Sequence, residues 1–415
     1  MLSDITDKDI EFKDYKKQSD IHGTALYPAV MIAPIQKKIL KELLSEDNTI
    51  HTVFDPFHGS GTALYEASTL SSDIDVIGCD INPLANLFTR VKLEGINIQH
   101  IYKDIDSLKS FINTSSTVQI EKLSFHKIEK WFKPDIIDAL SLLKSAITNI
   151  KCKRNRLYFW YMLSDIIRKY SNTRSTTYKL HIRPQTMIDS LPSGDCLIED
   201  YISRVEKNVN KFKYHTSKYK LYKEDILSKI KHFHSNNFDI SITSPPYGDN
   251  ATTVPYGQFS MLSLYIIDKK DLKLEGWELE NYSIIDNHSL GGKKSKVVLS
   301  DFEKSLLEPY LSKIKESMHK KVITFFSDYF SFLKELVRVT NKYIIITLGH
   351  RTVDRVKINL TQITQDYLVQ YHFNNILTRT RDIKKKRIPK VTSIVDDQPV
   401  SSMNKEYISI FQYQE

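Results

Sequence analysis

The chain has 415 residues, of which 41% are hydrophobic and 26% charged, and this composition argues against wholesale disorder, a collagen-like repeat and a disulfide scaffold. Its length is enough for two or three domains of roughly 100 to 200 residues each. Lys and Arg number 59 against 50 Asp and Glu, a formal net charge of +9. Such a charge suits a polyanionic partner, although basic proteins without one are common.

The cysteines and the N-terminal residues indicate the cellular compartment. Cys79, Cys152 and Cys196 form neither a Cys-x-x-Cys pair nor a Cys/His spacing typical of zinc sites. The first residues lack the basic and then apolar profile of a signal peptide, and no apolar run approaches the roughly 20 residues that cross a bilayer. We therefore expect a cytoplasmic protein that needs no metal and contacts no membrane.

In chain order, the sequence predicts an open, parallel α/β sheet interrupted by insertions. Helices are expected at 63–70 and 325–339. Strands are expected where short β-favouring or apolar runs end in turn residues, at 52–54, 75–79, 219–222, 238–243 and 342–348. A β-like segment at 371–377 and a last strand at 407–411 predict a terminal β-hairpin.

Two insertions divide this core. Apolar residues recur at three- and four-residue spacing between about 105 and 210, which predicts a helical block. The stretch that follows residue 260 is polar. We therefore expect three regions: a catalytic core at 20–104, 215–260 and 320–415, a helical insertion at 105–214, and a polar insertion at 261–319.

The first motif that carries chemistry is the turn after the first strand, Asp55-Pro56-Phe57-His58-Gly59-Ser60-Gly61-Thr62. Glycines let the backbone approach a ligand closely, and the N-terminus of the following helix favours an anion. Asp80 ends the next strand. It follows Gly61 by about the 20 residues that separate the glycine turn from the acid that binds the ribose hydroxyls in nucleotide-binding α/β folds. A nucleoside-bearing cofactor is therefore expected. The turn is neither a Walker phosphate loop, since the Gly-Lys-Ser/Thr ending is absent, nor the three-glycine nicotinamide fingerprint. A purely structural turn is the alternative.

The second motif, Ser244-Pro245-Pro246-Tyr247, ends a buried strand. Adjacent prolines cannot continue a sheet, so the Ser244 hydroxyl, the Pro245 carbonyl and the Tyr247 ring should project together from the edge where open α/β sheets bind ligands. The two oxygens can accept hydrogen bonds from an amino group, and the ring can stack on a nucleobase. A plain strand-ending turn is again the alternative.

Together the two motifs resemble those of the S-adenosylmethionine-dependent amino-DNA methyltransferases, which modify cytosine N4 or adenine N6. The turn 55–62 is similar to the family's cofactor motif and 243–247 to its catalytic motif, in the branch that has the cofactor motif first. Tyr27-Pro28-Ala29 resembles its N-terminal cofactor-pocket element, and Lys223-Glu224-Asp225-Ile226 its acidic motif beside the cofactor adenine. The resemblance covers around half of the chain and implies a Rossmann-like class I methyltransferase sheet.

The resemblance implies S-adenosyl-L-methionine as cofactor and double-stranded DNA as substrate, in a restriction-modification or related defence system with a cognate restriction endonuclease as a candidate partner. It assigns catalysis to Ser244, Pro245, Pro246 and Tyr247. It assigns cofactor binding to Tyr27, Pro28, Asp55, Pro56, Phe57, Gly59, Ser60, Gly61, Thr62, Asp80, Ile81, Asp225 and Ile226.

The target base follows from the first residue of the catalytic tetrapeptide. In this family a serine there, preceded by Thr243, is associated mainly with cytosine N4, and an aspartate with adenine N6. A cytosine-C5 enzyme needs a cysteine nucleophile, and none of the three cysteines follows a proline. The alternatives are an N6-adenine enzyme, an RNA (tRNA guanine-N2) or protein-glutamine methyltransferase, and a DNA-binding subunit with a decayed site.

DNA recognition is assigned to the insertions, as is usual in this family, and the target base is expected to flip out of the duplex. Trp131, within the helical insertion, is expected in the core. The candidate phosphate contacts are arginines in that insertion and near the terminal hairpin, namely Arg174, Arg379, Arg381 and Arg387.

Overall fold

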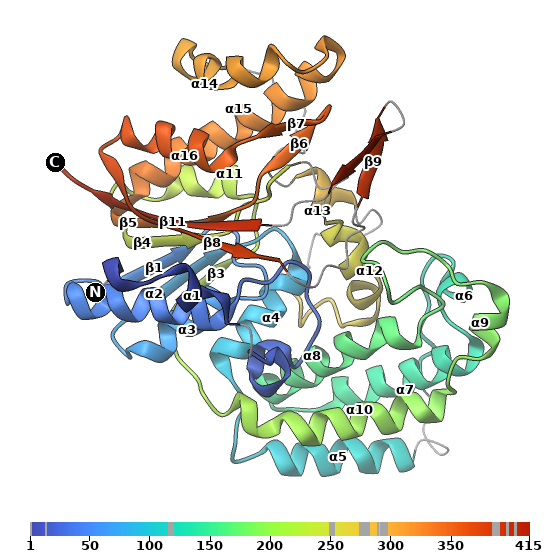
Figure 1. Ribbon diagram of the computed structural model, residues 1–415. Helices are drawn as coiled ribbons and strands as arrows, with labels where there is room; N and C mark the ends of the chain where they lie inside the picture. Colours follow the sequence, from blue (N-terminus) through green and yellow to red (C-terminus); the bar gives the residue numbers. More distant parts are fainter. Residues whose placement is uncertain are drawn as a thin grey trace.

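The computed structural model describes residues 2–12, 15–114, 120–248, 254–273, 283–288, 290, 298–383, 391–395, 398–401 and 405–415. A seven-stranded sheet in the order β3-β2-β1-β4-β5-β11-β8 lies at its centre (Figure 1). The neighbours from β3 to β5 are parallel, and β11 is antiparallel to both β5 and β8. The strands are β1 Thr52–Asp55, β2 Asp75–Cys79, β3 Tyr219–Tyr222, β4 Phe238–Thr243, β5 Thr340–Leu348, β8 Phe373–Asp382 and β11 Lys405–Tyr413.

Helices cover both faces of the sheet, which is why β4 and β5 are rich in isoleucine on both sides. Ile344 and Ile346 face a core formed with α15 (Glu316–Val339) and α16 (Leu360–Val369). Ile240, Ile242 and Ile345 face the opposite core, which α2 (Ala33–Glu46) and α3 (Thr62–Leu70) close. Figure 1 shows α15 and α16 above the sheet and α2 and α3 below it.

The helical block packs against helices at one end of the sheet and shares a core with them. Its helices are α5 Ile101–Asn113, α6 Ile128–Trp131, α7 Pro134–Asn149, α8 Lys153–Tyr170, α9 Gln185–Asp189 and α10 Gly194–Asn208. Trp160 and Tyr161 of α8 belong to one apolar cluster with Phe88 of α4 (Pro83–Glu94) and Leu262 of α12 (Tyr256–Ile266). The block therefore extends the sheet's own helical layer. Trp131 is half-buried at its margin.

The remaining elements are short. The described helices among them are α1 Asp7–Glu11, α11 Ile226–Lys229, α13 Ser283–Asn287 and α14 Asp301–Leu311, with 3-10 turns at Leu2–Asp4, Lys17–Ser19, Ile21–Gly23, Val209–Phe212 and Ile230–His232. Two small hairpins join β6 Arg351–Val353 to β7 Val356–Ile358 and β9 Val391–Val395 to β10 Gln398–Ser401. No helix in the described part of the chain is both long and apolar enough to cross a membrane.

The five predicted parallel strands and the terminal antiparallel pair all form. The expected helix at 325–339 is the second part of α15, which begins earlier, at Glu316. The expected region limits at 104/105, 260/261 and 319/320 fall inside α5, α12 and α15. The prediction that 261–319 is polar is wrong at its start, because the second half of α12 is apolar and buried in the shared core.

Candidate active site

The carboxyl ends of β1, β2 and β4 meet at one edge of the sheet. β1 pairs in parallel with β2 on one side and β4 on the other, so Asp55, Asp80 and Ser244 leave three neighbouring strands in the same direction. The chain reaches β4 only after building the half of the sheet beyond β2. Open α/β sheets bind ligands at such a switch point, outside the carboxyl ends.

The turn between β1 and α3 depends on two glycines in the left-handed region. Gly59 has φ 51° and Gly61 has φ 74°, a conformation that costs other residues roughly 1–2 kcal/mol. A Cβ on Gly61 would lie only 2.5 Å from Thr89 Cγ2, whereas one on Gly59 would lie 3.5 Å from the Tyr27 ring. Gly61 is therefore required by packing, whereas a side chain on Gly59 would begin with only ordinary van der Waals contacts.

Two carboxylates fix this turn through the main chain. Gly59 N donates to Asp80 Oδ2 at 3.0 Å, and Asn82 N donates to Asp80 Oδ1 at 2.8 Å. Phe57 N donates to Asp55 Oδ1 at 3.0 Å, while Asp55 Oδ2 has no hydrogen-bond partner among the described residues. Burial raises the pKa of Asp55 to about 7, and the Phe57 NH opposes this shift. The Thr243 hydroxyl is near enough to lower the pKa as well, but it makes no well-formed hydrogen bond, since Thr243 Oγ1 also has no partner among the described residues. Burial also raises the pKa of Asp80.

Buried polar side chains support the turn from beneath. Lys92 Nζ of α4 donates to the Ser60 carbonyl at 2.7 Å, and burial lowers the pKa of Lys92 to about 7. Thr89 Oγ1 shares a hydrogen bond of 3.0 Å with His58 Nδ1 and donates to the Gly59 carbonyl at 3.1 Å. We did not predict these supports, because Lys92 lies in an apolar helix face with no local motif to single it out.

Tyr27 and Pro28 are brought to the same edge. Both residues are buried, and the Tyr27 ring lies in an aromatic cluster with Phe88, Tyr256 and Phe259. Asn82 Nδ2 donates to Tyr27 Oη at 3.2 Å and to Ser260 Oγ at 2.8 Å. Asn82 also caps α4, and the Asn-Pro pair that begins this helix was a signal in the sequence that could have identified it.

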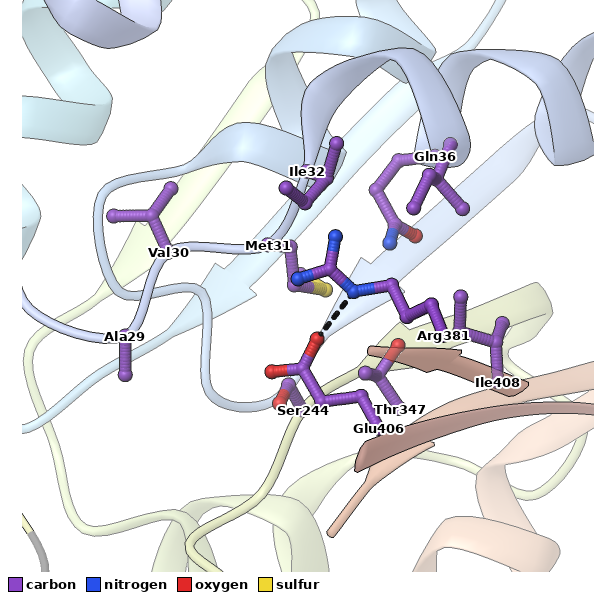
Figure 2. A pocket seen from close by; sticks show the side chains of 11 residues that line it. Ala29, Val30, Met31, Ile32, Gln36, Ser244, Thr347, Arg381, Glu406 and Ile408 are labelled. Atoms are coloured by element: carbon purple, nitrogen blue, oxygen red, sulfur yellow. Dashed lines mark hydrogen bonds and ion pairs between the residues drawn. The ribbon is translucent and has the colours of Figure 1, made fainter. Parts of the chain in front are cut away.

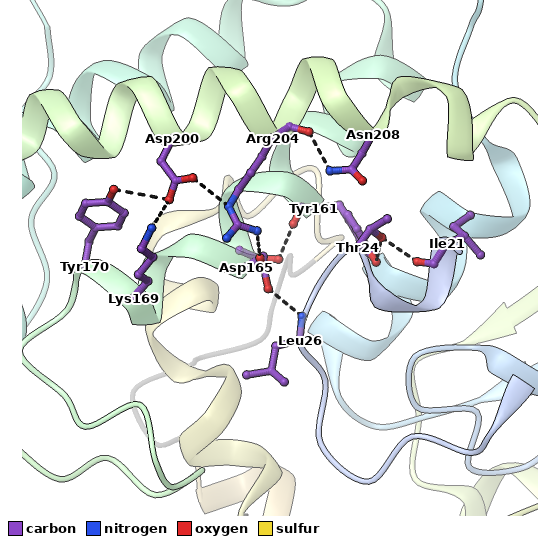
Figure 3. A network of polar contacts seen from close by, with 11 residues as sticks. Ile21, Thr24, Leu26, Tyr161, Asp165, Lys169, Tyr170, Asp200, Arg204 and Asn208 are labelled. Carbon is purple, nitrogen blue, oxygen red and sulfur yellow. Dashed lines mark hydrogen bonds and ion pairs between the residues drawn. The ribbon is translucent and has the colours of Figure 1, made fainter. Parts of the chain in front are cut away.

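The helical block holds the segment that leads into Tyr27 (Figure 3). Leu26 N donates to Asp165 Oδ1 at 2.7 Å, and Asp165 is ion-paired with Arg204. Thr24 Oγ1 and Tyr161 Oη share a hydrogen bond of 2.8 Å. Burial raises the pKa of Asp165, and the Arg204 charge opposes this shift. The block thus positions part of the candidate cofactor site, in addition to any role in recognition.

The other candidate cofactor residues line or support this edge. Asp225 follows β3 and caps α11 by accepting from Leu227 N at 3.0 Å. The Phe57 ring packs on Phe332 of α15 with centroids 5.1 Å apart. Pro56, Ser60, Thr62 and Ile226 are buried, and Ile81 is half-buried. The structure therefore places eleven of the thirteen predicted cofactor residues at the carboxyl ends of β1, β2 and β3 or in the turns that follow, and Tyr27, next to Pro28, reaches the same edge through Asn82.

The catalytic tetrapeptide leaves β4 next to this site. Ser244 Oγ and Tyr247 Oη share a hydrogen bond of 2.9 Å, so the two functional groups meet across Pro245 and Pro246. Burial raises the pKa of Tyr247 far above its usual range, and the phenol is therefore neutral at physiological pH. The following Gly248 lies against Arg351 of β6.

A small cavity of about 10 Å³ lies beside Ser244 (Figure 2). Its walls come from the segment after Pro28, the first turn of α2 and the ends of β5, β8 and β11, including Gln36, Thr347, Arg381 and Glu406. Arg381 Nε donates to Glu406 Oε2 at 2.8 Å. Sequence reasoning did not place Gln36, Thr347 or Glu406 in the site, because they lie on separate elements far apart in the chain.

The predicted phosphate contacts occupy different environments. Arg174 is exposed. It directly follows a buried turn of the helical block, in which Ser171 Oγ and Thr173 Oγ1 share a hydrogen bond. The Arg379 guanidinium donates to the carbonyls of Ile5 and Thr378. Arg381 faces the cavity beside Ser244. Arg387 lies outside the described residues.

The sheet order, the reversed strand β11, the glycine turn after β1 and the Pro-Pro end of β4 define a Rossmann-like methyltransferase fold. Over 400 residues, the chain is 29% identical to the type II methyltransferase M.MvaI of Kocuria varians, and the alignment covers 90% of this chain and 86% of that protein. No protein-family model matches the chain.

The cofactor that the resemblance implies, S-adenosylmethionine, fits the residues at this edge. Asp55 Oδ2 is a buried acceptor with no hydrogen-bond partner among the described residues, as suits a cationic ligand, and a Cβ on Gly59 would meet no atom closer than 3.5 Å. Asp80 lies where a ribose-binding acid is expected. Among the described residues, no group of three His, Cys, Asp or Glu side chains is placed to hold a metal ion.

Proposed function

We propose that this protein is a DNA methyltransferase that transfers a methyl group from S-adenosylmethionine to the N4 amine of cytosine in double-stranded DNA, as the modification enzyme of a restriction-modification system. The observation that carries the proposal is the meeting of Ser244 and Tyr247 at the end of β4, beside the acidic glycine turn of β1. The likeness to a type II methyltransferase supports the reaction class. The serine of the tetrapeptide supports the choice of base.

Bound S-adenosylmethionine supplies an electrophilic methyl group. Tyr27, Asp55 and Asp80 would hold it against the glycine turn, with Asp225 and Ile226 at the adenine end. Asp55 contributes a carboxylate whose free oxygen suits the cofactor's cationic end. Because Gly59 N and Asn82 N already fix Asp80, that acid is held in place before any ligand arrives.

On the substrate side, the flipped cytosine would stack on the Tyr247 ring. Its amine would then donate to Ser244 Oγ and the Pro245 carbonyl, and the Ser244–Tyr247 hydrogen bond would give way to this contact. Both acceptors would draw on the amine hydrogens and direct the nitrogen lone pair toward the methyl group, and the proton that N4 loses on methylation would leave along one of these hydrogen bonds to solvent. Positioning of this kind recovers roughly 7–11 kcal/mol of barrier in well-oriented systems, so the residues seen require no metal.

The direct test is incubation of the protein with DNA and labelled S-adenosylmethionine, followed by identification of the methylated nucleoside. N4-methylcytosine is the expected product. N6-methyladenine would move the assignment to the other amino-DNA enzymes, and label only in RNA or protein would refute it. A methylated site should also become resistant to a restriction endonuclease of matching specificity.

Two substitutions test the roles at the end of β4. Ser244→Ala and Tyr247→Ala should each lower methyl transfer at least 100-fold, because each removes a group that positions the base, while the fold is retained. Matched controls are Ser45→Ala and Tyr102→Ala, which remove an exposed serine and an exposed tyrosine remote from the site. Near-normal turnover in both site variants would contradict the proposed mechanism.

A further inference from the structure

We propose that Arg381 reads the target base: its guanidinium, fixed by Glu406, donates hydrogen bonds to the O2 and N3 acceptors of cytosine while Ser244 holds the N4 amine. This inference rests on the proposed function and deepens it, because it assigns the choice between cytosine and adenine to a side chain. It also gives Arg381 a role other than the phosphate contact predicted from the sequence.

The position of the pair is the first support. Arg381 and Glu406 stand directly opposite each other in the antiparallel register of β8 and β11. They lie toward the edge of the sheet that carries Ser244 and line the same cavity with it (Figure 2). The Arg381 side chain is 12% exposed and the Glu406 side chain 23%. An ordinary cross-strand ion pair on an exposed surface would be worth little, whereas this one is partly desolvated beside the catalytic serine.

Two buried polar atoms in the wall of the cavity lack hydrogen-bond partners among the described residues. Gln36 is 1% exposed and Thr347 is 5% exposed. Both line the cavity, and Gln36 Oε1 and Thr347 Oγ1 have no hydrogen-bond partner among the described residues. Buried polar atoms are almost always paired, so two unpaired ones in a cavity indicate a polar ligand group or a water molecule.

The size of the cavity limits what can enter it. A volume of about 10 Å³ is close to the smallest that holds one water molecule, so a whole base does not fit. A carbonyl oxygen is of water size. The base ring would therefore remain on the Tyr247 side of Ser244, and its polar edge alone would reach the guanidinium.

The chemistry of the guanidinium then selects the base. Arginine has five N–H donors and no acceptor, and the contact with Glu406 Oε2 uses the Nε donor. On the pairing edge of cytosine the amine is followed by two acceptors, N3 and O2, which match a bidentate donor. Adenine offers N1 and then a C–H group. Arg381 should thus favour cytosine, and Glu406 should fix the orientation of the guanidinium plane.

The test first maps the modified base in the wild-type reaction and then compares duplexes with cytosine or adenine at that position. Arg381→Ala and Arg381→Lys should each lower kcat/KM for the cytosine duplex by about 10- to 100-fold or more, since one charge-assisted hydrogen bond is worth about this much and the bidentate contact has two. The small activity on the adenine duplex should change far less. Glu406→Gln, which keeps the side-chain shape, should show a smaller loss of the same preference.

A cytosine analogue that lacks O2 completes a double-mutant cycle. The wild-type enzyme should lose activity on the analogue, but less than Arg381→Ala loses on cytosine, because the analogue keeps the N3 contact; the variant should no longer distinguish the two duplexes. Lys405→Ala, which removes an exposed charge next to Glu406 on the same strand, is the control and should leave the base preference unchanged.

The alternatives give different outcomes. A phosphate contact would be largely retained in Arg381→Lys, and in Arg381→Ala it would reduce the salt dependence of DNA binding by about 0.9 in the log–log slope; either result overturns base reading. Equal losses on both bases would also overturn it. If the wild-type protein methylates no DNA, the proposed function fails, whereas an active wild type with unchanged preference in the variants refutes this inference alone.

Discussion

The cofactor end and the base end of the site are built in different ways. At the cofactor end, Asp55, Gly59 and Asp80 lie within one β-α-β unit, and main-chain hydrogen bonds fix the carboxylates. At the base end, only Ser244 and Tyr247 are close in sequence. Their surroundings come from four further elements, α2, β5, β8 and β11, and depend on contacts between side chains.

This difference has a physical consequence. Main-chain hydrogen bonds depend on the backbone path, so the cofactor turn is specified by glycines and acids that few substitutions can replace. Side-chain contacts between separate strands can change without altering the path of the chain. We infer that the cofactor end fixes the reaction and that the base end is where specificity can vary.

The largest expected effect tests the rigidity of the cofactor turn. Gly61→Ala should lower the free energy of unfolding by about 2–5 kcal/mol, because it adds the cost of a positive φ to a clash with Thr89. Chemical denaturation monitored by circular dichroism measures this loss. S-adenosylmethionine binding should weaken in parallel.

Gly59→Ala is the matched control for this substitution. It has the same positive φ, but its Cβ would meet the Tyr27 ring at an ordinary 3.5 Å. Its cost should therefore be only about 1–2 kcal/mol, the backbone contribution alone. Equal losses in the two variants would show that packing under the turn does not matter, and the contrast between the two ends would weaken.

A smaller effect tests whether the cofactor end is as local as its motif. Asp165→Ala removes the acceptor of Leu26 N and leaves Arg204 without this partner, so the free energy of unfolding should fall by about 1–3 kcal/mol. Cofactor affinity should fall with it, because Leu26 precedes Tyr27. Asp165→Asn keeps an acceptor for Leu26 N and should retain most of the affinity. Titration calorimetry on both variants measures this difference, and unchanged affinity in Asp165→Ala would show that the helical block does not position Tyr27.

The same contrast explains what could be predicted from the sequence. The strands of the sheet, the turn 55–62 and the end of β4 were predictable, because apolar runs, glycines and prolines act on their own neighbours. The supports under the turn were not, since Lys92 bonds to Ser60 through a helix that passes below it. Nor was the pairing of Arg381 with Glu406, which depends on the register of two strands separated by β9 and β10. Sequence alone does not give the direction of a side chain either, so the phosphate contacts assigned to the basic segment near the terminal hairpin stay a prediction.

The smallest expected effect concerns pH at the cofactor end. Burial raises the pKa of Asp55 to about 7, so its carboxyl is mostly neutral at pH 6 and mostly ionised at pH 8. A cationic ligand favours the ionised form, and the affinity for S-adenosylmethionine should therefore rise about tenfold between these values, or about 1.4 kcal/mol. Protein stability should change in the opposite direction: the native state binds more protons than the unfolded chain between pH 3.8 and about 7, so stability falls as pH rises through this window. Asp55→Asn should remove this contribution to both trends, which separates it from titration of the cofactor's own amino group. If the variant keeps the full pH dependence of binding, Asp55 is not the group that receives the cationic end of the cofactor.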